Sequence, residues 1–223
     1  MKKFLYFVVA LIIVAIGIYF FATRPVEAPP AVAPAGEVPS ESETGVVQKW
    51  SIDPANSTAK FEIDEELRGE PFHVVGQTKV VSGDVSYDAT NGKVSGLISI
   101  DGATLKTDSS QRDGAIGRFI LHTEDADKRF ITFALKEVTT IPPDPVLDTS
   151  YTFTVRGTLT INGISKEVSW TMTGKAAAGG TITGTAKTTV KRGDFGLTIP
   201  NIPFVANVSE NVGLILDFVF LKK

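Results

Sequence analysis

A hairpin over residues 151–172 constrains the fold of this chain more than any other feature. Apolar residues alternate with threonine and arginine along residues 151–161, and this period of two is typical of a strand with one buried face. Asn162-Gly163 follows, a dipeptide that accepts the positive φ angles of a two-residue type I′ turn. A two-residue loop fixes the register of the two strands. The predicted pairs are Val155 with Trp170 and Phe153 with Met172 on an apolar face, and Arg156 with Ser169 and Thr158 with Glu167 on a wet face.

The same alternation recurs throughout residues 50–223, a length that suits a single domain with a sizeable core. Further strands are predicted within residues 59–63, 94–100, 131–135, 182–188 and 212–220. The turn signals between the runs include Asp53-Pro54, Asn91-Gly92, the proline-rich 142–145 and Gly179-Gly180. One short helix is predicted over residues 109–119. Many antiparallel strands in one domain favour a barrel or a sandwich, and a closed barrel has no exposed strand edges.

The N-terminal segment predicts where this domain lies. Residues 4–22 carry no charge, and a helix of that length spans about 28 Å, close to the thickness of a bilayer's hydrocarbon core. Lys2 and Lys3 precede the segment, which favours a cytoplasmic N-terminus and export of the rest. We therefore expect residues 1–23 to be an uncleaved membrane anchor, with the β domain in the periplasm or at the cell surface. A cleaved signal peptide is the alternative, although its apolar core is usually shorter and is followed by small residues.

Residues 24–49 form a predicted linker that is rich in proline, alanine and glutamate and poor in core-forming residues. The four basic and four acidic side chains of residues 1–49 cancel, so the chain's net charge of −3 belongs to residues 50–223. An acidic domain without a basic stripe argues against nucleic acid as a partner.

Combinations of residues that carry catalysis are scarce. The two histidines, His73 and His122, have no second ligand at metal-binding spacing, and the chain contains no cysteine for a thiol nucleophile or a disulfide. No serine lies in a G-x-S-x-G motif. An acidic cluster within residues 62–66 could imitate glycosidase carboxylates, but a solvated strand end explains it more simply. The sequence predicts no catalytic residue, no metal site, no cofactor and no enzyme.

Short motifs in a fixed order resemble the YceI-like, polyisoprenoid-binding domain family. They cover nearly all of residues 50–223, and the ordered set is more specific than any member. The motifs are Trp50-Ser51-Ile52-Asp53, Val81-Ser82-Gly83-Asp84-Val85, Leu105-Lys106-Thr107-Asp108, Gln111-Arg112-Asp113, Ile131-Thr132-Phe133, residues 157–164 and Arg192-Gly193-Asp194-Phe195-Gly196-Leu197. Two positions depart from the family pattern: Asn56 replaces a frequent histidine, and Arg129-Phe130 replaces an aromatic-proline pair.

The resemblance implies an extended, lipocalin-like antiparallel barrel of about eight strands with one short helix, preceded here by the single N-terminal transmembrane helix. Such a barrel would hold a long isoprenoid or similar amphiphile in an apolar interior. The inward residues expected to line it are Phe61, Ile98, Ile100, Phe119, Phe133, Phe153, Val155, Trp170, Leu214, Leu216 and Phe218. Arg112, Lys191 and Arg192 are the candidate contacts for a polar head group. Small residues such as Gly157, Gly184 and Ala186 are expected to leave room inside, although the same pattern also fits a filled core.

The leading hypothesis is a membrane-tethered, extracytoplasmic protein that binds isoprenoid-like lipid for storage or transport. The alternative is a ligand-free interaction module at the cell surface. It would use the outer face of the last strand, where Ile215, Val219 and Leu221 surround Asp217. The sequence does not indicate an oligomeric state.

Overall fold

The computed structural model describes residues 47–88, 93–139 and 146–223. The predicted anchor, most of the linker and the turn signals at Asn91-Gly92 and residues 142–145 lie outside these ranges. In the described ranges, no helix has both the length and the apolar composition that a membrane span needs. The strands are β1 (Val47–Ile52), β2 (Thr58–Leu67), β3 (Glu70–Thr78), β4 (Val81–Asp88), β5 (Lys93–Asp101), β6 (Phe130–Thr139), β7 (Tyr151–Ile161), β8 (Ile164–Ala176), β9 (Ile182–Lys191), β10 (Val205–Ala206) and β11 (Asn211–Lys222).

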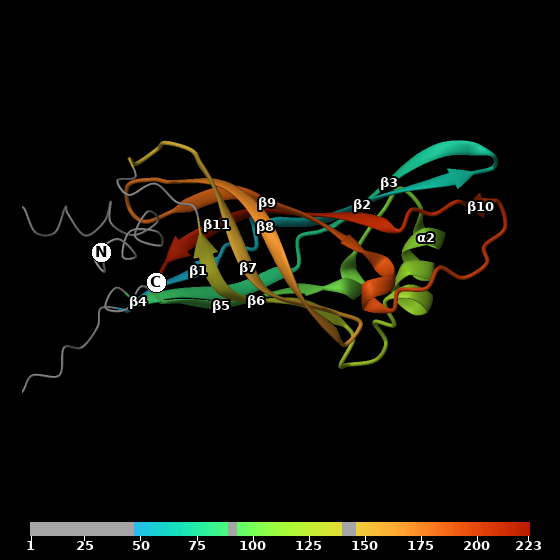
Figure 1. The fold of residues 1–223 in the computed structure, drawn as a ribbon, viewed down its shortest axis with the longest axis horizontal. Helices are drawn as coiled ribbons and strands as arrows, with labels where there is room; N and C mark the ends of the chain where they lie inside the picture. The colour runs from blue at the N-terminus through green and yellow to red at the C-terminus, as the bar shows by residue number, and fades with distance from the viewer. Residues whose placement is uncertain (1–46, 89–92, 140–145) are drawn as a thin grey trace, which may run out of the picture.

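Eight antiparallel strands close into a barrel in the order β1-β4-β5-β6-β7-β8-β9-β11 (Figure 1). The last strand returns to the first, with Trp50 paired to Lys222 and Ile52 to Phe220. The prediction of an all-β, eight-stranded antiparallel barrel is therefore confirmed. Because closure and the buried core both lie within residues 47–223, this segment has what a domain needs to fold on its own.

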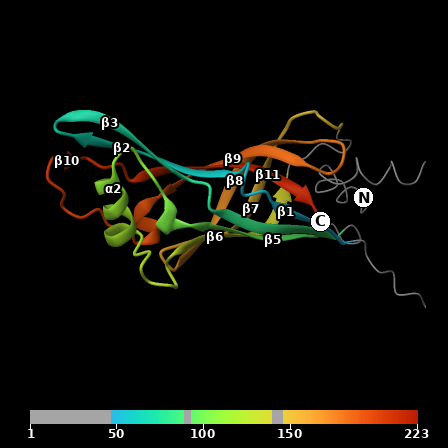
Figure 2. The same cartoon turned by 180° about the vertical axis from the view of Figure 1, so that it is seen from behind.

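The β2–β3 hairpin lengthens one side of the barrel beyond the closed ring. β2 pairs with the first half of β11, from Glu62 opposite Gly213 to Thr58 opposite Asp217, and β3 pairs with β2. β10 pairs with the tip of β2. Figures 1 and 2 show this hairpin at the end of the molecule that also carries α2, while β1 and the C-terminus lie at the other end. The sequence patterns had identified only the first strand of this hairpin.

The hairpin of β7 and β8 forms with the register that the sequence predicts. Asn162 and Gly163 have φ angles of 53° and 75°, as a type I′ turn requires. All four predicted pairs are present, including Val155 with Trp170 and Thr158 with Glu167. The hydroxyl of Thr158 donates a hydrogen bond of 2.7 Å to the Glu167 carboxylate on the wet face.

The predicted helix over residues 109–119 is present, but it changes pitch halfway. Ser109 caps α2 (Ser110–Ala115) by accepting a hydrogen bond from the Arg112 backbone N–H. The chain then widens into the π-helical turn η3 (Ile116–Ile120), in which the Leu121 N–H donates to the Ile116 carbonyl at 2.8 Å. This helical segment lies at the end of the barrel opposite β1 (Figure 1).

An ion pair between a buried carboxylate and a half-exposed arginine fixes the base of the helical excursion between β5 and β6. Asp101, at the end of β5, accepts hydrogen bonds from Arg129 through both carboxylate oxygens, at 3.1 and 2.7 Å. One of these oxygens also caps η2 (Gly102–Thr104) by accepting from the Ala103 N–H. These bonds, led by the one from Arg129, outweigh burial and hold the pKa of Asp101 below its ordinary value.

We expect Asp101→Asn to destabilise the barrel by about 2 kcal/mol at pH 7, because it replaces charged hydrogen bonds with neutral ones. A lowered folded-state pKa contributes stability above the unfolded pKa, near 4, and this contribution is lost as the pH falls through the folded value. Urea unfolding should therefore give a lower free energy of unfolding for the variant than for wild type at pH 7. This difference in free energy should become smaller below about pH 4. A gap that stays constant with pH would contradict this assignment.

The end of the barrel that carries β1 is closed. Trp50 is 1% exposed and its indole N–H donates to the Gly180 carbonyl at 3.1 Å. The rings of Phe218 and Phe220 pack against each other at 5.3 Å between centroids. The interior therefore ends in a plug of aromatic side chains on this side.

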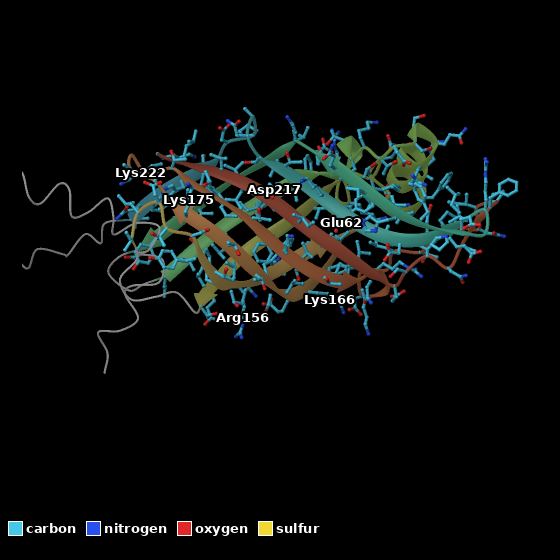
Figure 3. The ribbon with its side chains drawn as sticks, turned by 90° about the horizontal axis from the view of Figure 1, so that it is seen from above. Glu62, Arg156, Lys166, Lys175, Asp217 and Lys222 are labelled. Atoms are coloured by element: carbon cyan, nitrogen blue, oxygen red, sulfur yellow. The ribbon has the colours of Figure 1, made fainter. Side chains whose placement is uncertain are left out.

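The outer surface of the barrel is polar, as Figure 3 shows for Glu62, Arg156, Lys166 and Asp217. Asp217 forms a 2.8 Å ion pair with Lys60 and accepts a hydrogen bond from the Thr185 hydroxyl. These bonds cross the outer face of β11 that the interaction-module hypothesis would use.

Candidate functional site

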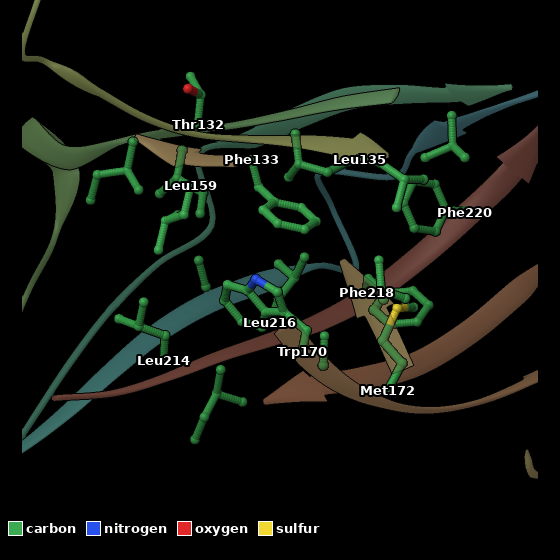
Figure 4. A pocket seen from close by; sticks show the side chains of 18 of the residues that line it. Thr132, Phe133, Leu135, Leu159, Trp170, Met172, Leu214, Leu216, Phe218 and Phe220 are labelled. Carbon is green, nitrogen blue, oxygen red and sulfur yellow. The ribbon is translucent and has the colours of Figure 1, made fainter. Parts of the chain in front are cut away.

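An apolar cavity of about 160 Å³ lies inside the barrel and is called here the inner chamber. Figure 4 shows aromatic and aliphatic side chains from several strands converging on it, among them Phe133, Trp170, Met172, Leu216 and Phe218. They converge because alternate residues of every strand in a closed barrel point inward. The chamber offers apolar contact on all sides.

Ten of the eleven residues predicted to line the interior do line the inner chamber. They are Phe61, Ile98, Ile100, Phe133, Phe153, Val155, Trp170, Leu214, Leu216 and Phe218. Their contact with a bound lipid stays a prediction.

The eleventh residue, Phe119, was placed wrongly by the sequence analysis. Its side chain is 54% exposed and it lines neither of the two cavities described here. Ile116 and Ile120 of the same π-helical turn face the outer cavity described below, so Phe119 projects from another side of the turn. The apolar pattern of residues 116–120 indicated burial without showing which side of a widened turn would be buried.

Aromatic rings pack against Gly157 and Gly184, so these two positions do not leave open space. A Cβ atom at Gly157 would lie 2.7 Å from the ring of Phe133, and one at Gly184 would lie 2.7 Å from the ring of Phe218. The tip of each ring therefore packs against the bare backbone of the neighbouring strand. The expectation that these two positions leave room is corrected, whereas Ala186 does face the inner chamber.

A second cavity of about 690 Å³, the outer chamber, continues from the first. Five residues line both: Phe61, Leu105, Ile131, Ile161 and Leu214. Most of its remaining wall comes from the β2–β3 hairpin, α2, η3 and residues 197–208. It therefore lies at the end opposite Trp50, and together the chambers form one interior that is closed at β1 and wide at α2.

Six charged side chains line the outer chamber, three of each sign: Glu65, Glu70, Asp108, Arg68, Arg112 and Arg192. Arg112 is 18% exposed; it pairs with Glu65 at 3.0 Å and with Asp108, and its guanidinium lies 5.2 Å from the centroid of the Phe72 ring. It thus joins α2 to both strands of the β2–β3 hairpin.

Arg192 has an equally complete set of protein partners. Its guanidinium pairs with Glu210 at 3.2 Å and donates to the carbonyls of Leu197 and Ser209, each at 3.2 Å. Lys191, the third predicted head-group contact, is exposed and lines neither chamber. It alternates with the buried Val190 on β9 and so faces outward, which corrects its assignment.

Glu65 and Phe72 are among the lining residues that sequence reasoning missed. The acidic cluster is divided in the structure: Asp64 pairs with His73, Glu66 accepts from Asn207, and Glu65 is 8% exposed beside Arg112. A usable signal was present, because Glu65 continues the period of two that begins at Phe61 and Ile63. A charged residue at an inward position implies a buried partner.

We expect Arg112→Met to loosen α2 from the hairpin, because the substitution leaves the Glu65 carboxylate buried without its cation. Breaking a pair of this kind typically costs about 3 kcal/mol. Amide hydrogen exchange in residues 108–120 should accelerate, while the strands of the closed ring, such as β7 and β8, keep their protection against exchange.

Two further variants test the cause. Arg118→Met on the same segment removes an exposed ion pair with Glu124 and should leave exchange nearly unchanged. The double variant Arg112→Met with Glu65→Met removes both charges and should restore much of the protection. If Arg118→Met has the larger effect, the Arg112 contacts do not hold the segment.

The described ranges contain no group of three His, Asp or Glu side chains that could hold a metal ion. His73 Nδ1 lies 2.6 Å from an Asp64 oxygen on the exposed hairpin, and this hydrogen bond raises the pKa of His73.

The geometry of the two chambers suits the binding of an apolar chain with a polar end.

Comparison with known proteins identifies the barrel. The family model described as YceI-like domain matches residues 50–220, and none of the curated proteins matches the chain. Among solved structures, BcnA of Burkholderia cenocepacia is 18% identical, with 75% of this chain and 98% of that chain covered at a TM-score of 0.58. A polyisoprenoid binding domain from Saccharophagus degradans, implicated in plant cell wall breakdown, is 16% identical, with 78% and 98% covered at 0.62. A YceI protein of Campylobacter jejuni is 20% identical, with 66% and 84% covered at 0.52. The chain belongs to the YceI-like domain family.

Proposed function

We propose that the barrel binds a long-chain lipid of the isoprenoid type and holds its apolar part in the inner chamber. The observation that carries the proposal is the apolar inner chamber and its continuation into a wider chamber with polar groups. An amphiphile needs such a gradient of polarity along its length. Family membership supports the same reading, because a protein with this fold is described as a polyisoprenoid binding domain.

The energetics of such a site favour exchange over permanent capture. Removing an isoprenoid tail from water gains about 0.8 kcal/mol for each buried methylene. A bilayer gives the tail nearly the same gain, so that transfer from membrane to barrel is close to neutral. The proposed role is therefore reversible storage or transport of the lipid.

The membrane anchor at residues 4–22 and the extracytoplasmic location are part of this proposal. The first described residue, Val47, lies at the closed end of the barrel, and the outer chamber opens at the other end (Figure 1). Because β1 begins at Val47, a flexible linker would cover residues 24–46; it would span about 30 Å on average and keep the barrel at high effective concentration beside the membrane. With the chain entering at the closed end, the wide end is free to turn towards the anchoring membrane or another acceptor.

Native mass spectrometry with organic extraction tests the proposal on residues 46–223 purified from cells without detergent. We expect a long-chain lipid to co-purify at near-stoichiometric level. Protein that carries no lipid and also refuses added polyprenols and prenylquinones would overturn lipid binding and favour the interaction module.

A further inference from the structure

The wide end of the barrel carries a long segment without a charged side chain. Residues 195–209 contain no Asp, Glu, Lys or Arg. Apolar residues of this segment line the outer chamber, while Pro203 and Phe204 are also exposed to solvent. The prolines at positions 200 and 203 have no backbone N–H, which reduces the number of polar groups that the segment presents. Such a surface loses little hydration when it meets an apolar phase.

Phe204 is displayed at this end in a conformation that its residue type disfavours. Its side chain is 73% exposed and its φ angle is 67°, in the left-handed region that bulky residues rarely adopt. Two neighbours hold the backbone there: the Arg68 N–H donates to the Phe204 carbonyl at 2.7 Å, and β10 starts at the next residue and pairs with β2. The Arg68 guanidinium lies 5.9 Å from the ring centroid, a contact that contributes little at an exposed site. Packing within the protein therefore does not explain a phenylalanine at this position.

The charges around Phe204 do not form a patch of one sign. Arg68 lies at the turn of the β2–β3 hairpin, close to Glu66 and Glu70, and Glu66 accepts a hydrogen bond from the Asn207 side chain at 2.7 Å. An exposed ring beside an arginine of mixed surroundings is typical of side chains that lie in the interfacial layer of a bilayer. The tip is therefore suited to an uncharged or zwitterionic lipid surface.

The chain that precedes the barrel is long enough to bring this tip to a membrane. Val47 lies at the closed end (Figure 1), and the predicted linker over residues 24–46 reaches about 70 Å when fully extended. From the closed end to the tip, β11 and the overhanging half of β2 measure at most about 50 Å, at roughly 3.3 Å for each residue. The linker therefore exceeds the length of the barrel.

On the basis of the proposed function, we infer that Phe204, together with Pro203 and the aliphatic part of Arg68, inserts into the interfacial layer of the anchoring membrane. The outer chamber then opens against the bilayer, and an apolar chain passes between the two without crossing water. Insertion of one ring is a weak interaction, so the contact is reversible and depends on the tether that keeps the barrel near the membrane.

A tryptophan reporter tests the docking. Residues 24–223 with an N-terminal hexahistidine tag are attached to phosphatidylcholine vesicles that contain a nickel-chelating lipid, so that the tag replaces the anchor. We expect the added emission of Phe204→Trp to shift to shorter wavelength and to be quenched by phosphatidylcholine brominated near the head group. Leu97→Trp is the matched control, because Leu97 is 53% exposed on the middle of β5. Its added emission should be neither shifted nor quenched.

A charge at the tip provides the second test. Aspartate adopts positive φ angles more readily than phenylalanine, so Phe204→Asp should stay folded in urea unfolding. In flotation of untagged residues 46–223 with phosphatidylcholine vesicles, Phe204→Asp should lower the bound fraction about tenfold, because an aromatic ring no longer leaves water. Leu97→Asp should leave the bound fraction unchanged.

The outcomes distinguish docking from lipid binding. If Phe204→Trp is not quenched on vesicles, or Leu97→Trp is quenched equally, docking through the tip is overturned, whereas co-purified lipid would still support the proposed function. Quenching at Phe204→Trp in a barrel that never binds lipid supports docking while the proposed function fails. A shift that appears without vesicles and grows with protein concentration also overturns docking, because a second copy of the chain then covers the ring.

Discussion

Trp50→Ala is expected to lower the free energy of unfolding by about 3–5 kcal/mol, the usual cost of removing a fully buried aromatic side chain. Trp50 is 1% exposed and joins β1 to the turn after β8 through its hydrogen bond to Gly180. β1 is also the strand that closes the barrel, since it pairs with β4 on one side and β11 on the other. The loss of its anchor therefore weakens closure as well as packing. Urea unfolding of residues 46–223 measures the effect. The dependence of the free energy of unfolding on urea concentration should be compared between variants, to confirm that they expose the same surface on unfolding.

Trp50→Phe is the matched control, because it keeps a buried ring and removes the indole N–H that donates a hydrogen bond to the Gly180 carbonyl. It should cost clearly less than Trp50→Ala, about 1–2 kcal/mol, for the lost hydrogen bond and a smaller ring. Equal losses in the two variants would show that the hydrogen bond, and not the filling of the closed end, dominates at this position.

The sequence predicted those parts of the fold that depend on local pattern. The β7–β8 hairpin was predicted to the register, because alternation and the Asn162-Gly163 turn act over neighbouring residues. The pairing of β1 with β11 joins residues about 170 positions apart, and nothing in either strand's pattern specifies that partner. The β2–β3 hairpin was missed for a related reason: β3 mixes proline, glycine and histidine with valine, and its alternation is weak.

For the site as well, the sequence predicted what depends on local pattern and missed what depends on contacts between distant residues. The predicted residues on regular strands line the inner chamber, because the period of two indicates which face of a strand is buried, and their contact with a ligand stays a prediction. Phe119 lies outside both chambers because a π-helical turn does not follow a simple period. Lys191 obeys the period of two on β9 and faces outward beside the buried Val190. The pairing of Arg112 with Glu65 joins α2 to β2 across 47 positions, and only the folded chain brings these charges together.

Filling the inner chamber should remove deep lipid binding while leaving the barrel folded. Ala186 is buried on β9, and its register partners Met172 and Leu216 also line the chamber. The ring of Ala186→Phe would therefore occupy the space that the proposed lipid needs. Excluding about four methylene groups costs roughly 3 kcal/mol of binding, more than a hundredfold in affinity. Titration with a ubiquinone of two isoprene units and native mass spectrometry of the co-purified lipid measure the loss.

Thr189→Phe supplies the control, because it adds the same ring to the same strand on the exposed outer face. It should keep wild-type lipid content and, as a surface substitution, wild-type stability within about 0.5 kcal/mol. Ala186→Phe should unfold within about 1–3 kcal/mol of wild type, the usual cost of overpacking. If Ala186→Phe keeps full affinity and the same lipid, the ligand does not enter the inner chamber. Binding would then be confined to the outer chamber, and the proposal would reduce to a shallower site at the wide end. Loss of binding in Ala186→Phe alone would place the lipid beside Met172 and Leu216, within the apolar end of the barrel.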